Sequence, residues 1–538
     1  MKKSLLAIIV AVIAVAGVAA FFIIKNDSIF TESEPQRAKI DKDFVCYFNI
    51  EQLAKKGVFD KHITPDQRRL AATMASANIH NGEVAAHAEA TITDLAMSGI
   101  DITKPVYGYL DTDIEAMVFV AEVADVDNLD KTVGILTYLA EQEDGEHLEI
   151  EQIEDDRYLH LNDAIICYND TRAAFIIADD EVAQIAAAEA LNSLLLDLRL
   201  FGDTDIAIYL DVNTAIDYIE NEASGEDLPA DTFSKLHENF TKDAYFVSSI
   251  TFNPGRAVLH SYFEGVSENA DNAANDAVTL NHLNYINDSM LAVMGGSING
   301  PKATELIETS LNSKAMASLD NETNMAIAIA LDALETIKGD VTLALESLDG
   351  EYKEYIDYYW GDVAYRPVVS NASGALMADV TDTYIISNVG QFASGLLRKA
   401  GDNHYSGRFG DYDISILQRD NLLFAGVNTP METAEKPASK ARWIKDIDGS
   451  VAYMLIDVDN VMRSSFIKAV SDVLVKNIEY PQIYTQLTQM LSYAYLTIYS
   501  NGSSDVVLVM DDATTNSLEQ LNDVLLPVAV SEFIKSIM

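Results

Sequence analysis

Three apolar runs rich in β-prone residues are each followed by a short polar segment and then by a helical pattern. The runs are Met117 to Val123, Ile206 to Leu210 and Val451 to Ile456, and the polar segments are Asp125-Val126-Asp127-Asn128, Asp211-Val212-Asn213-Thr214 and Asp457-Val458-Asp459-Asn460. A looser fourth copy, Phe44 to Leu53, has Asn49 in the position of the aspartate. Asp, Asn and Thr cap helices by accepting hydrogen bonds from free backbone N–H groups. The pattern therefore predicts repeated strand-then-helix units in an α+β protein.

The order of predicted elements after residue 288 resembles the order before residue 266. The corresponding elements are Asp340 to Leu348 and the strand at Pro105, Gly374 to Val380 and the strand at Met117, and the units at Val451 and Ile206. We expect two related halves, residues 44–265 and 289–538, joined by a polar linker at 266–288. Each half is expected to contain mixed, mostly antiparallel sheets with packed helices.

An unbroken apolar run, Leu5 to Ile24, lies near the N-terminus. At about 1.5 Å per residue it can cross the ~30 Å hydrocarbon core of a membrane as a helix. Lys2 and Lys3 favour a cytoplasmic N-terminus, so we expect a single-pass signal anchor at residues 1–25, a spacer at 26–43 and the bulk of the chain in the periplasm. The alternative is a secreted protein whose signal peptide is cleaved at Val18-Ala19-Ala20. Because the apolar run continues through residues 21–24, we favour the uncleaved anchor in the inner membrane.

The second half contains an insertion, Asp349 to Val368, where the first half has a tight hairpin between Leu110 and Met117. Six aromatic residues lie in it: Tyr352, Tyr355, Tyr358, Tyr359, Trp360 and Tyr365. Aromatic side chains in such an insertion can stack on a sugar or anchor a protein partner. Tyr358, Tyr359 and Trp360 are therefore the candidate binding residues. The alternative is a helical stripe of Tyr352, Tyr355 and Tyr359 packed on the sheet.

Aspartate and glutamate outnumber lysine and arginine 84 to 36, for a net charge of −48. Nucleic acid is excluded as a partner because phosphate binding needs a basic patch. An anionic lipid surface would also repel the chain, so the expected membrane contact is the apolar run at residues 5–24. The two cysteines, Cys46 and Cys167, lie within predicted strands and are expected to be buried free thiols, although a single bridge is the alternative.

Two loop motifs lack residues that their chemistry requires. An EF-hand beginning at Asp125 would need glycine at its sixth position and glutamate at its twelfth, where the chain has Asp130 and Leu136. The segment Gly295 to Lys302 lacks the Ser or Thr that follows the lysine of a phosphate loop, because residue 303 is alanine. Helix capping accounts for the first motif and an ordinary helix start for the second.

Candidate catalytic and metal-binding patterns are similarly incomplete. His80, Glu83 and His87 share one face of a predicted helix, but Gly82 lies within that helix and the zincin order of residues is absent. The sequence contains neither a GxSxG elbow nor a catalytic-cysteine context. We therefore expect no cofactor, no metal and no catalytic residue.

Four short segments resemble an uncharacterised cell-envelope protein family, a domain of unknown function common in Bacteroidetes. They are Phe44 to Leu53, Ser98-Gly99-Ile100-Asp101, Lys338-Gly339-Asp340 and Asn516-Ser517-Leu518. The resemblance covers nearly all of the chain after the apolar run. It implies an envelope location and this fold plan, without an assigned activity. Members of that family often begin with a lipoprotein signal, whereas no cysteine directly follows the apolar run here.

These expectations define a membrane-anchored, extracytoplasmic binding or scaffolding protein of the bacterial cell envelope. Its partner would be an envelope protein or a glycan. The alternative is an envelope hydrolase, for example one directed at glycans, that uses acidic residues.

Overall fold

The computed structural model describes most of the chain after residue 38. The exceptions are residues 62, 78, 112–115, 144–147, 162–163, 179–195, 197, 223–231, 267–275, 311–320, 357–362, 393–395, 476–479 and 538. The apolar run at residues 5–24 lies outside the described residues. Within the described part, none of the helices is long and apolar enough to cross a membrane.

The chain divides into two compact units. The first unit contains Ser33–Ser267 together with Asp512–Met538, and the second unit contains Glu268–Asp511. The division after Ser267 falls at the start of the linker expected at residues 266–288. The C-terminal segment differs from expectation, because it belongs to the first unit although the second half was expected to run to residue 538.

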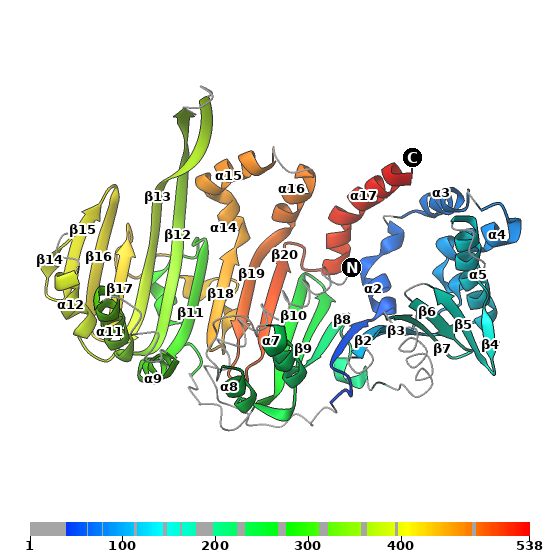
Figure 1. Ribbon diagram of the computed structural model, residues 1–538. Helices are drawn as coiled ribbons and strands as arrows, with labels where there is room; N and C mark the ends of the chain where they lie inside the picture. Colours follow the sequence, from blue (N-terminus) through cyan, green and yellow to red (C-terminus); the bar gives the residue numbers. More distant parts are fainter. Residues whose placement is uncertain are drawn as a thin grey trace. The chain divides into compact units, whose positions relative to one another are not determined.

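The first unit contains ten described strands that form an antiparallel arrangement (Figure 1). In chain order they are β1 (Phe44–Phe48), β2 (Val106–Asp111), β3 (Ala116–Glu122), β4 (Glu151–Ile153), β5 (Asp156–Leu161), β6 (Ala164–Tyr168), β7 (Arg172–Ile177), β8 (Ile206–Asp211), β9 (Phe240–Asn253) and β10 (Arg256–Val266). Side by side they follow the order β4-β5-β6-β7-β3-β2-β1-β8-β9-β10.

The second unit also contains ten described strands. They are β11 (Ala292–Asn299), β12 (Ile337–Ile356), β13 (Val363–Val380), β14 (Leu397–Gly401), β15 (His404–Phe409), β16 (Tyr412–Arg419), β17 (Leu422–Val427), β18 (Ala452–Asp457), β19 (Leu491–Ile498) and β20 (Ser504–Met510). Their order is β14-β15-β16-β17-β13-β12-β11-β18-β19-β20. If the strands of each unit are numbered from one to ten in chain order, the two units have the same order of strands across the sheet.

Every strand pairing described within the two units is antiparallel. The α+β class is therefore confirmed, and the expected mixture of strand directions is corrected to antiparallel. The local sequence could not settle this point, because a capping aspartate ends a strand and begins a helix whichever way the strand is paired.

Helices connect or flank these strands. The α-helices of the first unit are α2 (Ile50–Gly57), α3 (Pro65–Ser76), α4 (Gly82–Thr93), α5 (Val126–Glu143), α7 (Val212–Glu222), α8 (Thr232–Glu238) and α17 (Ser517–Ile537). Those of the second unit are α9 (Gly300–Ser310), α11 (Asn321–Glu335), α12 (Tyr384–Phe392), α13 (Ile444–Ile447), α14 (Val458–Arg463), α15 (Ser465–Val475) and α16 (Pro481–Met490). Short 3₁₀ turns are η1 (Phe59–Lys61), η2 (Leu95–Ser98), η4 (Leu198–Phe201), η5 (Asn281–Tyr285) and η6 (Ala438–Lys440).

The four predicted capping residues accept the expected hydrogen bonds. Each side-chain Oδ1 accepts from the backbone N–H three residues later, at 3.1 Å for Asn49, 3.0 Å for Asp125 and Asp211, and 2.9 Å for Asp457. Asp211 ends β8 and Asp457 ends β18, which are the eighth strands of their units. The capping interpretation of these motifs is therefore confirmed.

The core of the first unit lies on one face of its sheet, where alternate strand residues are buried. Val45, Tyr109, Val118, Ile176 and Tyr209 are each no more than 2% exposed and belong to one cluster. A separate cluster joins α5 to β5 and β6 through side chains that include Leu129 and Leu159. Each face of this sheet therefore has its own buried cluster.

Candidate functional site

The aromatic insertion of the second unit forms a two-stranded β-ribbon. Strands β12 and β13 remain paired as far as Ile356 and Val363. Their described neighbours stop earlier, since β11 pairs with β12 only to Leu345 and β17 pairs with β13 only from Gly374. At about 3.3 Å per residue, the continuing pair is a ribbon of roughly 30 Å. Figure 1 shows β12 and β13 extending together past the ends of β11 and β17.

This geometry corrects the helical alternative for the insertion. Tyr352 and Tyr355 lie in β12, where Tyr352 is opposite Pro367 and Tyr355 is opposite Ala364. Their spacing also fits a helix, but cross-strand pairing with residues 363–371 determines the structure. The candidate residues Tyr358, Tyr359 and Trp360 lie outside the described residues, in the segment that connects Ile356 to Val363.

The base of the ribbon is attached to the start of α15. Ser464 Oγ donates a hydrogen bond to the carbonyl of Leu348. The backbone N–H of Gly350 donates to Ser465 Oγ at 2.9 Å, and the Tyr352 hydroxyl donates to the carbonyl of Ala469 at 2.9 Å. An isolated two-stranded ribbon is only marginally stable in water. These contacts therefore give the base of the ribbon a fixed support.

Gly350 allows the ribbon and α15 to approach this closely. A Cβ atom at this position would lie 2.5 Å from Cα of Phe466 and 2.7 Å from its Cβ. Backbone atoms cannot move aside as a flexible side chain can, so only glycine fits here without displacing α15. The same residue contributes the N–H that bonds to Ser465.

The insertion is acidic as well as aromatic. Residues 349–368 contain five carboxylate side chains and two basic ones, Lys353 and Arg366. Tyr352 is 46% exposed although its hydroxyl is bonded to α15. The insertion therefore combines tyrosine and tryptophan with a net negative charge.

A row of exposed apolar side chains crosses the sheet from which the ribbon extends. Leu376, Leu343, Met294 and Met454 lie directly opposite one another on β13, β12, β11 and β18. Their exposed fractions are 43%, 48%, 43% and 39%. Neighbours that stand directly opposite in a sheet project from the same face, so these four form one continuous surface, the apolar row.

Sequence reasoning missed the apolar row, although a signal was present. The strand Ala452-Tyr453-Met454-Leu455-Ile456 is apolar at every position, whereas a half-exposed strand usually alternates with polar residues. Such a run predicts apolar side chains on both faces. Which positions are covered depends on contacts distant in sequence: Leu455 is fully buried, while Met454 is exposed.

A buried chain of hydrogen bonds contains the residue types of a hydrolase triad. His282 Nδ1 lies 3.0 Å from Thr342 Oγ1, and its Nε2 lies 3.2 Å from Asp379 Oδ1. Burial raises the pKa of Asp379, but hydrogen bonds from His282 and from the Asp340 N–H outweigh it and leave the pKa below its usual value. Thr342 is 1% exposed and His282 is 2% exposed, so a substrate cannot reach either. These hydrogen bonds are structural and join η5 to β12 and β13.

The histidine pattern singled out by sequence does not form a metal cluster in the described residues. Helix α4 begins at Gly82 with Asn81 as its cap, so His80 precedes the helix. His87 Nε2 instead lies 3.0 Å from Thr132 Oγ1. His80, Glu83 and His87 therefore do not share one helical face as expected, because His80 lies before the helix.

The fold defines an α+β protein whose two units share one strand order and whose second unit carries the β12–β13 ribbon. The family model described as a domain of unknown function (DUF4836) matches residues 38–362. This is more than half of the chain, and the chain therefore belongs to that family. The match ends within the aromatic insertion, so it covers less of the chain than the sequence resemblance implied.

Similarity to other known proteins is distant. Crystal form I of TP0453 is similar at 10% identity and a TM-score of 0.22, over 45% of this chain and 77% of that one. Crystal form IV gives 10% identity and a TM-score of 0.23 over 41% and 76%. No curated protein matches the chain. Likeness at this level carries no argument about activity.

Proposed function

We propose that the chain is a binding or scaffolding protein that presents the β12–β13 ribbon to a protein partner. The observation that carries this proposal is the ribbon itself, which extends beyond its sheet and is supported at its base by α15. A ribbon held at its base loses less conformational freedom on binding than an unsupported loop, which favours its use as a recognition element. Tyrosine and tryptophan are enriched among residues that dominate interface energies.

The charge of the ribbon indicates the chemistry of the partner. Residues 349–368 have a net charge of −3, from five acids and two bases. A partner with a basic rim around an aromatic-binding pocket complements this surface and would associate faster at low salt. A glycan would use the aromatic side chains alone, so its binding would be insensitive to salt.

The apolar row extends the proposed interface onto the sheet. Its members Leu343 and Leu376 lie on the two strands that continue into the ribbon, so one partner can contact both surfaces. Burying these exposed side chains contributes about 25 cal/mol per Å² of apolar area. The Leu343→Asp variant should weaken partner capture at least tenfold, whereas Leu95→Asp, a change at a 60% exposed leucine of the first unit, should leave it unchanged.

The main test replaces Tyr358, Tyr359 and Trp360 together with alanine in the full-length chain. Loss of capture of one defined protein, with an unchanged melting temperature, supports a binding role for these residues. Phe409→Ala is the matched control, because Phe409 is a 60% exposed aromatic residue elsewhere in the same unit. A melting temperature lowered by several degrees with capture intact would instead make the three aromatics part of the core.

We also propose that residues 5–24 anchor the protein in the inner membrane, with its folded part in the periplasm. The length of the apolar run and the preceding lysines support this arrangement. The protein should then remain in the membrane pellet during carbonate extraction. A mature N-terminus near Phe21, measured by mass spectrometry, would contradict the anchor and indicate a secreted protein.

A further inference from the structure

We propose that Asp217, Glu220 and His237 of the first unit form a binding site for a divalent transition-metal ion, with zinc as the best fit. Each residue offers one ligand atom, and the three atoms all lie within 4.8 Å of one another. His237 Nε2 is 3.1 Å from Asp217 Oδ1. A single ion can therefore contact all three side chains after small rotamer changes.

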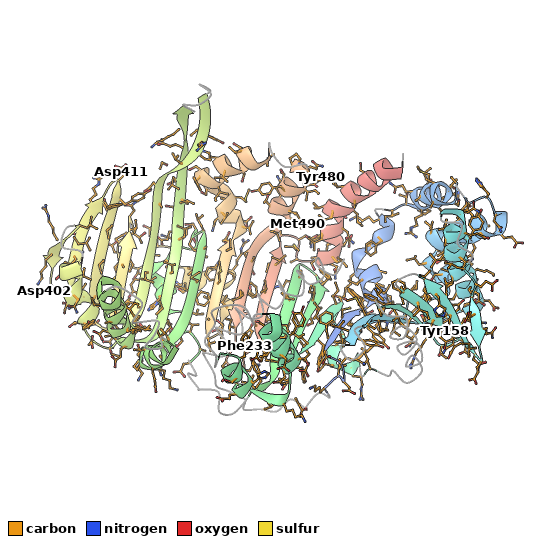
Figure 2. All side chains as sticks on the ribbon, viewed as in Figure 1. Tyr158, Phe233, Asp402, Asp411, Tyr480 and Met490 are labelled. Atoms are coloured by element: carbon orange, nitrogen blue, oxygen red, sulfur yellow. The ribbon has the colours of Figure 1, made fainter. Side chains whose placement is uncertain are left out.

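Two helices bring these residues together. Asp217 and Glu220 are three positions apart in α7, so their side chains lie on the same face of the helix. His237 lies near the end of α8, the helix in which Figure 2 labels Phe233. Because residues 221–236 separate the histidine from the carboxylates, spacing in the sequence did not reveal the cluster.

Asn213 orients the histidine toward the carboxylates. Its Nδ2 donates hydrogen bonds to the carbonyls of Thr241 and Lys242, at 2.9 and 3.3 Å. Because carbonyls only accept hydrogen bonds, these two bonds identify which atom of the Asn213 side-chain amide is nitrogen. The other atom, Oδ1, is then an acceptor and lies 3.2 Å from His237 Nδ1. Nδ1–H therefore donates to Asn213, and Nε2 is directed at Asp217 Oδ1, 3.1 Å away.

A metal ion at this position would replace the proton that Nε2 can share with Asp217. A metal-binding histidine typically donates its other ring N–H to an oxygen, which fixes the tautomer and the direction of the ligand nitrogen. Asn213, held by two backbone carbonyls, has this positioning role here.

The ligand set selects the class of ion. One imidazole and two carboxylates suit zinc and related transition metals, whereas calcium and magnesium prefer oxygen ligands alone. Three protein ligands leave a fourth position for water. Asp217 is 63% exposed at its side chain and His237 is 31% exposed, so an ion can enter from solvent. A bound ion would join α7 to α8.

Zinc titration of the full-length chain by calorimetry tests the proposal. We expect one zinc ion per chain, with affinity at least tenfold lower in His237→Ala and in Asp217→Asn. His80→Ala is the control, because His80 is exposed and outside the cluster, and it should bind zinc as the unchanged chain does. Cobalt(II) should give a visible absorption band that is lost in His237→Ala and shifted in Asn213→Ala.

Three outcomes would overturn the proposal. These are equal zinc affinity in the unchanged chain and His237→Ala, calcium binding as tight as zinc binding, or a cobalt spectrum unaffected by any of the substitutions. Circular dichroism establishes whether each variant is folded. If His237→Ala does not fold, Asp217→Asn still tests the site, because it retains the size of the side chain. The outcome is independent of partner capture, because the ribbon belongs to the second unit.

Discussion

The two cysteines show how individual residues are constrained by the sheet of the first unit. Both are free thiols, as expected from their positions within strands. Cys46 is in β1 and Cys167 is in β6, with β7, β3 and β2 between them. At about 4.8 Å per strand the separation is roughly 19 Å, beyond the ~7 Å limit for a disulfide. The predicted burial holds for Cys167, whereas Cys46 is only half-buried, and the separation of the two depends on strand order.

Cys167 should be unreactive in the folded protein. Burial, together with the charge of Asp156, raises the pKa of its thiol from 9.0 to about 12, so the reactive thiolate is scarce at neutral pH. In a Cys46→Ser variant, iodoacetamide at pH 8 should label Cys167 at least a hundredfold more slowly in the folded state than in guanidinium, as measured by mass spectrometry. Equal rates in both states would contradict this environment.

The same thiol predicts a direction for alkaline stability. Between pH 9 and about 12 the unfolded chain loses the Cys167 proton while the folded chain retains it. The folded state therefore binds more protons in this window, and the thiol's contribution to the free energy of unfolding falls as pH rises. A Cys167→Ala variant should lose stability less steeply over this pH range.

At the scale of elements, local chemistry predicted where strands end and helices begin, but it did not predict the ribbon. Asp211 and Asp457 end strands and cap helices through contacts three residues away, so their roles can be inferred from sequence. The spacing of Tyr352 and Tyr355 fits both a helix and a strand. Both tyrosines lie in a strand because they pair with Pro367 and Ala364, which are not their neighbours in sequence.

Gly350→Ala should loosen the base of the ribbon. The added Cβ would overlap Phe466, and such overpacking costs about 1–3 kcal/mol. Hydrogen exchange at residues 349–356 should become roughly tenfold faster or more, as measured by mass spectrometry. Gly82→Ala is the matched control, because nothing lies within 4 Å of its added Cβ. Unchanged exchange in Gly350→Ala would mean that α15 does not support the ribbon.

At the scale of the whole molecule, the repeated order of elements along the chain could be predicted from the sequence, but the route of the C-terminus could not. The elements at Ile206 and Val451 occupy the same place in the two units, as their similar patterns predicted. Helix α17 packs in the first unit through bonds such as that from Asn522 Nδ2 to the carbonyl of Gly57, at 2.8 Å and 465 residues apart. No local pattern encodes a contact of this separation.

Removal of residues 512–538 should destabilise the first unit selectively. Asn516 and Ser517 donate hydrogen bonds to the carbonyls of Phe252 and Arg256, at 3.0 and 2.9 Å, and each such bond contributes about 1 kcal/mol. Amide exchange in β9 should rise at least tenfold, while exchange in β12 and β17 stays the same. A similar change in both units would contradict the assignment of α17 to the first.

The most direct measurement of the proposed function places a photo-crosslinking amino acid at Tyr359 of the full-length chain in intact cells. We expect a protein adduct of one defined mass whose yield falls at high salt, because the acidic insertion attracts a basic partner. The same probe at Phe409 should give no such adduct. Equal adduct patterns at Tyr359 and Phe409, or a glycan adduct insensitive to salt, would contradict a protein-binding ribbon.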